Sequence, residues 1–451
     1  MSTIENAVTL LRQLVGQQAA HKHLKDMVDN IASCLVLLNS SRPSPQATEK
    51  LRSVLREPFQ PLYHAYPGPA LQLTSAVLSN ILGEKLSDAY IHGDPKLYAE
   101  WDKTAYVLLS GVLDALEKPA NDPFKVEVGR YLYPTICGFF FRERSQSAPP
   151  FSIELSVTAV SILSEAARGQ RSNQVFLRDR AYLGPARLGI MISTSRDYLI
   201  MESLLTLFAR LLSTGRVADG GSTRTQFVQE TLGSSELFKC NEELVRILHE
   251  ASTSDWNTIA TQLITALAKS DITYPQPFSV KEINACGHVF PQPDASDRLL
   301  LDRQGFLANV ILPMDDVCDS LMVPYGHIQT VNVGTPATAV NAVVVVVGLS
   351  SAPKIGNTTL KVDNGEFCLT FSLGREDLSR FMETLRRRGI GKLTFNNPAP
   401  RARKPKKSIS LASEVKFASD SSLPPPTADF QEKVKRVEEG SVLDFSSVLM
   451  I

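Results

Sequence analysis

The segment "LMVPYGHIQTVNV", Leu321 to Val333, lies where the hydrophobic period of the chain changes. Before about residue 270 apolar side chains recur with the period of a helix. After that point they alternate with the period of two that a half-buried strand requires. Pro324 restricts the backbone at a bend, and the residues after Tyr325 lead into the alternating run "HIQTVNV". The segment therefore predicts a β module that follows a helical region.

The sequence predicts six strands between residues 297 and 373. The run "DRLLLDRQGFLANVIL" gives two strands around a turn at Asp302 to Gly305, and the other four are predicted at 327–333, 342–348, 358–362 and 365–373. One amphipathic helix follows, with Leu378, Phe381, Met382 and Leu385 on its apolar face. This element order resembles a pleckstrin-homology-like (PH-like) β-barrel whose C-terminal helix plugs one end. We predict such a domain over residues 283–395.

The first 272 residues have helical periodicity almost throughout. One apolar face consists of Ala105, Leu108, Leu109, Val112, Leu113 and Leu116. Clusters of Pro and Gly separate such runs and predict about ten to twelve helices. Because a single core stops growing economically near roughly 250–300 residues, we interpret this region as an irregular α-solenoid of the armadillo or HEAT kind. A compact all-α domain is the alternative. The predicted fold class is thus α+β and multidomain.

The composition is that of an ordinary globular protein without an overall electrostatic field. Hydrophobic residues make up 43% and charged residues 21%, and 47 basic residues balance 47 acidic ones. Six scattered cysteines without a C-x-x-C pair predict free thiols in a reducing compartment. The longest apolar run, Ala342 to Leu349, is too short to cross a membrane, and the N-terminus does not read as a signal peptide. We therefore expect a soluble intracellular protein.

Motifs that would carry chemistry are weak. His21, His23 and Asp26 could suggest a metal site, but the two histidines lie on different faces of a predicted helix. Cys286 and His288 could suggest a nucleophile and a base, yet neighbours in sequence rarely converge on one substrate. No nucleophile elbow or dinucleotide-binding fingerprint occurs in the sequence. We expect a protein that is not an enzyme and that has no cofactor and no metal.

A phosphoinositide headgroup is a further possible ligand of the β module. Headgroup-binding PH domains place basic residues around the first hairpin, where this chain has Arg298 and Arg303. Asp294, Asp297 and Asp302 in the same region oppose an anionic ligand. Membrane binding is therefore not expected.

Residues 396–451 are rich in Pro, Ser and charge and have few apolar residues, so we predict a disordered tail. The tail contains a basic cluster followed by spaced apolar residues, namely Arg401, Arg403, Lys404, Lys406, Lys407, Ile409, Leu411, Val415 and Phe417. The basic cluster is typical of a nuclear import signal, of a weak phosphate contact or of a solvated linker. The apolar residues could dock on a partner as an added strand.

The segment "VPYGHIQTVNV" resembles the "-PY-x-x-I-" entry into a strand in the PH-like modules of FACT-type histone chaperones. Together with the helical region and the basic tail, it makes the chain similar to the N-terminal region of meiotic chromosome axis core proteins, the lateral-element proteins of the synaptonemal complex. The family ends in a long coiled coil, whereas "FQEKVKRVEEGSVL" offers at most two heptads here.

The resemblance implies a nuclear scaffold on chromosomes. In that family the helical and PH-like domains recruit chromosome or kinetochore proteins, and a segment after them is captured by a HORMA-domain partner. The corresponding segment here is Arg401 to Ser419. Direct binding of nucleic acid is expected to be weak or absent. The alternatives are a histone-chaperone-like module that binds chromatin and a membrane-trafficking adaptor with a PH-like domain.

Overall fold

The computed structural model describes most of the chain up to residue 396. The described residues are 2–17, 22–40, 42–118, 122–142, 150–212, 224–250, 256–291, 298–311, 318–334, 341–356, 358–362, 367–391 and 393–396. Their contacts divide them into two compact units. The first holds the described residues up to 195 and those of 199–245; the second holds 196–198 and the described residues from 246 onward.

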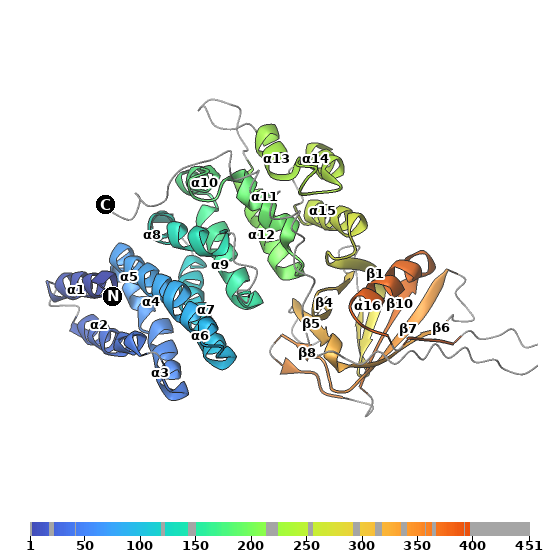
Figure 1. The fold of residues 1–451 in the computed structure, drawn as a ribbon, viewed down its shortest axis with the longest axis horizontal. Coiled ribbons are helices and arrows are strands. Elements are labelled where there is room, and N and C mark those ends of the chain that lie inside the picture. The colour runs from blue at the N-terminus through green and yellow to red at the C-terminus, as the bar shows by residue number, and fades with distance from the viewer. Residues whose placement is uncertain are drawn as a thin grey trace, which may run out of the picture. The chain divides into compact units, whose positions relative to one another are not determined.

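The first unit is built from helices, and the N-terminal region is 65% helical (Figure 1). The helices that begin within it are α1 (Ser2–Gly16), α2 (Lys22–Leu35), α3 (Pro45–Arg56), α4 (Phe59–Ala65), α5 (Pro67–Asn80), α6 (Leu86–Ile91), α7 (Pro95–Leu116), α8 (Asp122–Phe140), α9 (Ile153–Ala167), α10 (Arg171–Arg178), α11 (Gly184–Thr194), α13 (Arg224–Leu232) and α14 (Asn241–Glu250). Helix α12 (Tyr198–Leu211) begins with a residue of the second unit.

The polar and proline clusters of the sequence begin helices, as predicted. Ser44 accepts a hydrogen bond from the backbone N–H of Ala47 at 3.2 Å, and Asp94 accepts one from Leu97 at 3.0 Å. A proline follows each of these caps at the first helical position, where its missing N–H costs nothing. Ser152 caps α9 in the same way. These caps explain why the helices start where they do.

Helices of the first unit pack in two series. Helix α5 packs against α1 and α8, and helix α7 packs against α3 and α9; α8 and α9 then join the two series. Trp101 of α7 and Tyr133 of α8 are fully buried. Each series therefore contains a large buried side chain of its own.

The second unit combines helix α15 (Trp256–Ser270), a curled sheet and helix α16 (Leu378–Arg387). The strands are β1 (Gln276–Ala285), β2 (His288–Pro291), β3 (Arg298–Leu301), β4 (Gly305–Ile311), β5 (Cys318–Pro324), β6 (Ile328–Gly334), β7 (Ala342–Leu349), β8 (Lys354–Ile355), β9 (Thr358–Thr359), β10 (Cys368–Gly374) and β11 (Leu393–Asn396). Their order is β11-β6-β7-β10-β1-β3-β4-β5-β8-β9, and β2 pairs with β1. All pairs are antiparallel except β11 with β6.

The sheet curls into a half-barrel because β1 takes part in two ladders. Residues 276–279 of β1 pair with β3, whereas residues 280–285 pair with β10 and with β2. The concave side holds Phe278, Phe306 and Phe371 around Phe381 of α16, with ring centroids 5.4 to 6.4 Å from that ring. Phe381 is fully buried, so α16 packs against the concave side of the sheet (Figure 1). The amphipathic helix was predicted, but the sheet is a half-barrel and not the predicted barrel.

The turn at Pro324 has the predicted form. Pro324 ends β5 with φ −60° and ψ 142°, one turn of 3-10 helix follows at Tyr325–His327, and β6 begins at Ile328. The ring of Tyr325 meets that of Phe306 edge-on at 5.8 Å, and its hydroxyl donates to the carbonyl of Asp302 at 2.8 Å. Through these two contacts Tyr325 connects the start of β6 to the β3–β4 turn.

Several strands differ from the prediction. The runs at 327–333, 342–348 and 365–373 correspond to β6, β7 and β10, but the run at 358–362 contains only the two-residue strand β9. Strands β1, β2, β5, β8 and β11 were not predicted. The sheet begins at Gln276, before the predicted domain start at residue 283. Helix α16 is not the last element either, because β11 follows it and joins β6.

Candidate functional site

The predicted partner-binding residues of the tail lie outside the described residues. They are Arg401, Arg403, Lys404, Lys406, Lys407, Ile409, Leu411, Val415 and Phe417. The structure does describe the point from which this segment leaves the second unit. Strand β11 ends at Asn396, and only Asn397 to Pro400 separate it from Arg401. The peptide is therefore tethered by a very short linker to one edge of the sheet.

The two basic residues considered for a headgroup differ in their surroundings. Arg298 lies in β3, where it is half-buried and donates from Nη1 to the hydroxyl of Thr265 at 2.7 Å. Burial lowers the pKa of this guanidinium. Arg303 lies in the β3–β4 turn and is exposed. Arg298 is thus hydrogen-bonded within the unit, whereas Arg303 is exposed to solvent. The two guanidinium groups do not form a common anion-binding site.

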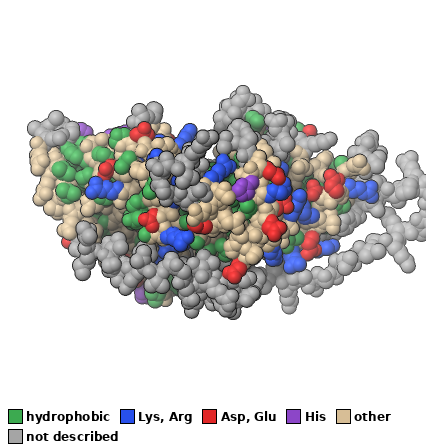
Figure 2. Space-filling model, turned by 90° about the horizontal axis from the view of Figure 1, so that it is seen from above, with side chains coloured by type: hydrophobic (Ala, Val, Ile, Leu, Met, Phe, Trp, Pro, Cys, Tyr) green, Lys and Arg blue, Asp and Glu red, His purple; other side chains and the backbone are tan. Residues whose placement is uncertain are grey.

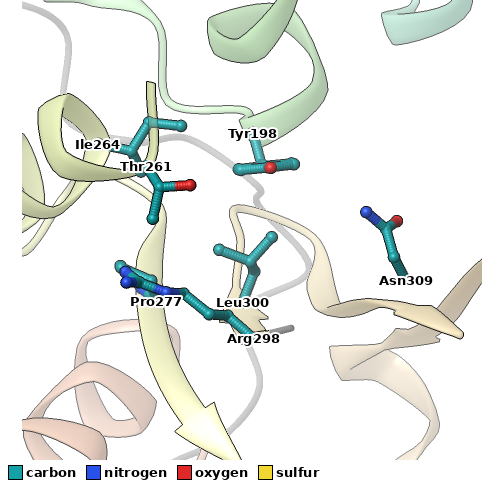
Figure 3. Close-up of a pocket in the computed structure, with 7 residues that line it drawn as sticks. All are labelled: Tyr198, Thr261, Ile264, Pro277, Arg298, Leu300 and Asn309. Carbon is teal, nitrogen blue, oxygen red and sulfur yellow. The ribbon is translucent and has the colours of Figure 1, made fainter. Parts of the chain in front are cut away.

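A small open hollow lies beside Arg298 (Figure 3). Its walls come from α15, β1, β3, β4 and the start of α12, and the lining residues are Tyr198, Thr261, Ile264, Pro277, Arg298, Leu300 and Asn309. These residues supply hydroxyls, one amide and one guanidinium beside apolar surface. The hollow thus offers hydrogen-bond partners and not a nucleophile with a base.

Two buried carboxylates meet at the β3–β4 turn. Asp302 is 7% exposed and Asp197 is 6% exposed, and the Oδ1 atom of Asp302 accepts a hydrogen bond from the N–H of Tyr198 at 3.0 Å. Burial, and then the charge of Asp197, raise the pKa of Asp302 to about 7, although hydrogen bonds from the backbone of Arg303 and Tyr198 act in the opposite direction. Asp302 therefore gains and loses a proton near neutral pH.

Cys286 and His288, which the sequence suggested as a nucleophile and a base, each have a structural role. Cys286 is buried in the β1–β2 turn with φ 54°, and its N–H donates to the carbonyl of Cys368 at 2.8 Å. Burial raises the pKa of the Cys286 thiol, which disfavours the thiolate that a nucleophile requires. The imidazole Nε2 of His288 donates to the carbonyl of Lys361 at 2.8 Å. This arrangement stabilises the turn.

The suggested metal ligands do not form a described site. His23 and Asp26 are exposed on α2, and His21 lies outside the described residues. Within the part of the chain that is described, no three His, Cys, Asp or Glu side chains are grouped as a metal site would require. Among the described residues, Cys34, Cys137, Cys240, Cys286 and Cys368 are not joined in disulfide bonds.

The convex side of the sheet has an unusual composition. Along β6, β7 and β10 buried and half-exposed side chains alternate, and the buried ones form the core beneath α16. The outward ones are Thr330, Asn332, Gly334, Ala342, Val344, Val346, Gly348, Cys368, Thr370, Ser372 and Gly374. None of them is charged. We call this set the outer β-face.

The described surface seen in Figure 2 is mixed in charge. Figure 2 shows acidic and basic side chains interspersed over the described residues of one face, in keeping with the zero net charge. Among the described helices none has both the length and the apolar character of a transmembrane span. Comparisons with protein-family models, with curated proteins and with solved structures gave no significant match.

Sequence reasoning missed both the carboxylate pair and the outer β-face. Asp302 looked like an ordinary turn residue because its partner Tyr198 lies 104 positions away. The signal for the outer β-face was present in the sequence. In "AVVVVVGL" and "CLTFSLG" the outward positions are small or β-branched and uncharged. That signal became readable only once the register of the strands was known.

Proposed function

We propose that this protein is a non-enzymatic nuclear scaffold of the meiotic chromosome axis. It recruits a HORMA-domain protein through its tail peptide and other chromosome proteins through its folded units. The observation that carries the proposal is the order of parts: a helical unit, a curled sheet filled by its own helix, and then a basic peptide that starts five residues after the last strand. Each part supplies a surface for binding and not a reaction centre.

The helical unit supports the reading as an irregular armadillo-like solenoid. Its helices pack in two series, α1–α5–α8 and α3–α7–α9, in which the middle helix, α5 or α7, contacts both of the others. Stacked helix pairs expose a long surface relative to their core, which suits the recruitment of extended partners. We assign the binding of chromosome proteins to this surface.

The second unit supports the reading as a PH-like module of the kind found in FACT-type chaperones. A half-barrel of antiparallel strands with one amphipathic helix in its hollow corresponds to that element order, and the Pro324–Tyr325 turn enters β6 as the resemblance requires. Strand β11 is an addition to this plan. It brings the tail to the edge of the sheet.

The tail peptide supplies the recruitment motif. Its five basic residues steer it towards an acidic partner and into the nucleus, whereas Ile409, Leu411, Val415 and Phe417 provide the spaced apolar contacts of an added strand. A partner that closes around such a strand would bind it mainly through backbone hydrogen bonds. The apolar side chains then select the register.

Binding of the peptide Asn396–Asp420 to purified HORMA-domain proteins tests the proposal. We expect a dissociation constant in the micromolar range, lost when Ile409, Leu411, Val415 and Phe417 are all replaced by Ser. Replacing the five basic residues by Gln is expected to weaken binding mainly at low salt, since exposed charges are screened. No binding at about 500 µM peptide, a free energy weaker than roughly −4.5 kcal/mol, would overturn the proposal.

A further inference from the structure

The outer β-face has the composition of an interface. Along three neighbouring strands the half-exposed positions carry Asn332, Val344, Val346, Thr370 and Ser372 without any charge, in a chain of which 21% is charged. An antiparallel sheet that faces water on one side normally carries polar and charged residues there. Depletion of charged residues is what distinguishes the core of a protein interface from the rest of a surface.

The register of the strands makes this face continuous. Asn332, Val346 and Thr370 lie side by side on β6, β7 and β10, and Gly334, Val344 and Ser372 form the next row. The other side of the same strands is already occupied, because their inward residues pack beneath Phe381 of α16. The outer β-face is thus a continuous, uncharged surface on the side away from the helix.

The tail leaves the sheet next to this surface. Strand β11 runs parallel to β6, and its last residue, Asn396, pairs with Gly334. That pairing places the exit point beside the row that contains Val344 and Ser372.

Four residues separate Arg401 from Asn396. A fully extended chain advances at most about 3.6 Å per residue, so the Cα atoms of Asn396 and Arg401 are no more than roughly 18 Å apart. A domain of about 100 residues has a radius of gyration of about 13 Å, so a domain that holds the peptide cannot lie far from this edge.

We propose that the protein domain that captures the tail peptide also docks on the outer β-face through an uncharged, partly apolar surface of its own. The inference rests on the proposed function, since it presupposes capture of the peptide, and it adds a second contact to that interaction. Two contacts on one partner raise the overall affinity, because the second forms at the high effective concentration set by the short linker. The full chain therefore binds this partner more tightly than the peptide does.

The test compares the full chain with the isolated peptide in binding to the same HORMA-domain protein. We expect the full chain to bind at least tenfold more tightly. Val344→Glu and Ser372→Glu, which each place a charge on the outer β-face, are expected to reduce the affinity of the full chain to that of the peptide. Thr358→Glu is the matched control, because Thr358 is exposed on β9 at the other end of the sheet.

The outcomes separate the two proposals. If the peptide does not bind, the proposed function fails. If the peptide binds but the full chain binds no more tightly, or if both Glu variants keep the affinity of the unaltered chain, the outer β-face is not a contact. The thermal midpoint of each variant shows whether it is folded, and Ser372→Glu still decides the question if Val344→Glu lowers that midpoint.

Discussion

The buried carboxyl of Asp302 makes the stability of the second unit depend on pH. Its pKa is raised from an ordinary value of 3.8 to about 7, chiefly by burial, so the folded state holds a proton that the unfolded chain releases. The contribution of Asp302 to the free energy of unfolding is therefore fully present below about pH 4. It is lost as the pH rises from there through 7. A pKa difference of about three units between the folded and the unfolded state changes the free energy of unfolding by at most about 4 kcal/mol.

Replacing Asp302 with Asn tests this linkage at the level of one residue. The amide oxygen can still accept the hydrogen bond from Tyr198, but the side chain no longer has to lose a proton. We expect D302N to flatten the fall in unfolding free energy between pH 5 and pH 8, measured by urea denaturation at each pH. Asp26→Asn, an exposed carboxylate on α2, is the control and should leave the profile unchanged. Parallel profiles for D302N and the unaltered protein would contradict the linkage.

Two glycines in helices of the first unit are expected to respond in opposite directions to the same substitution. A Cβ atom added at Gly189 on α11 would clash with the carbonyl oxygen of Thr231 on α13, whereas one added at Gly138 on α8 would meet nothing within 4 Å. Ala has the higher helix propensity, by about 1 kcal/mol. The glycine at 189 is therefore kept for the close approach of two helices.

Thermal unfolding of Gly189→Ala and Gly138→Ala measures this difference. Gly138→Ala should stabilise the protein by about 0.5–1 kcal/mol, because it only lowers the conformational freedom of the unfolded chain. Gly189→Ala should destabilise it by about 1–3 kcal/mol, the usual cost of overpacking, because α11 and α13 must separate. Equal shifts for the two variants would mean that the helices do not approach as closely as described.

The elements that the sequence predicted are those with a long uninterrupted pattern. Strand β10 alternates over seven residues, β7 contains an unbroken run of five valines, and α16 carries Phe381 and Leu385 one turn apart. Strand β1 was missed because Pro277, which a central strand normally excludes, lies near its start, where it faces Leu300 of β3. The two-residue strands β8 and β9 are too short to show any period. Strand β11 depends on its distant partner β6, which local pattern cannot reveal.

At the level of the whole molecule, composition indicated a globular protein but not where its partners bind. Because the net charge is zero, the chain as a whole does not attract a charged partner. Only local features are candidates for binding, namely the basic peptide and the uncharged outer β-face. The first could be read directly from the sequence. The second required the strand register, because Val344 and Val345 are identical in the sequence and lie on opposite sides of β7.

The short linker between Asn396 and Arg401 gives a prediction for the molecule as a whole. If one partner holds both the peptide and the outer β-face, a longer linker lowers the effective concentration of the second contact. A flexible insertion that lengthens the connection from four to 24 residues lowers that concentration by roughly 24/4 to the power 3/2, about 15-fold. We therefore expect a Gly/Ser insertion of about 20 residues after Pro400 to weaken binding of the full chain by about tenfold.

The same insertion placed after Ser419 is the control, since it leaves the linker between β11 and the peptide unchanged. Affinities are measured by calorimetry for the full chain in each case. An insertion after Pro400 without effect would mean that the peptide is held alone and that the outer β-face is not a contact for this partner. A loss of affinity that also occurs with Val344→Glu already present would point to the same conclusion, because that variant has no second contact left to weaken.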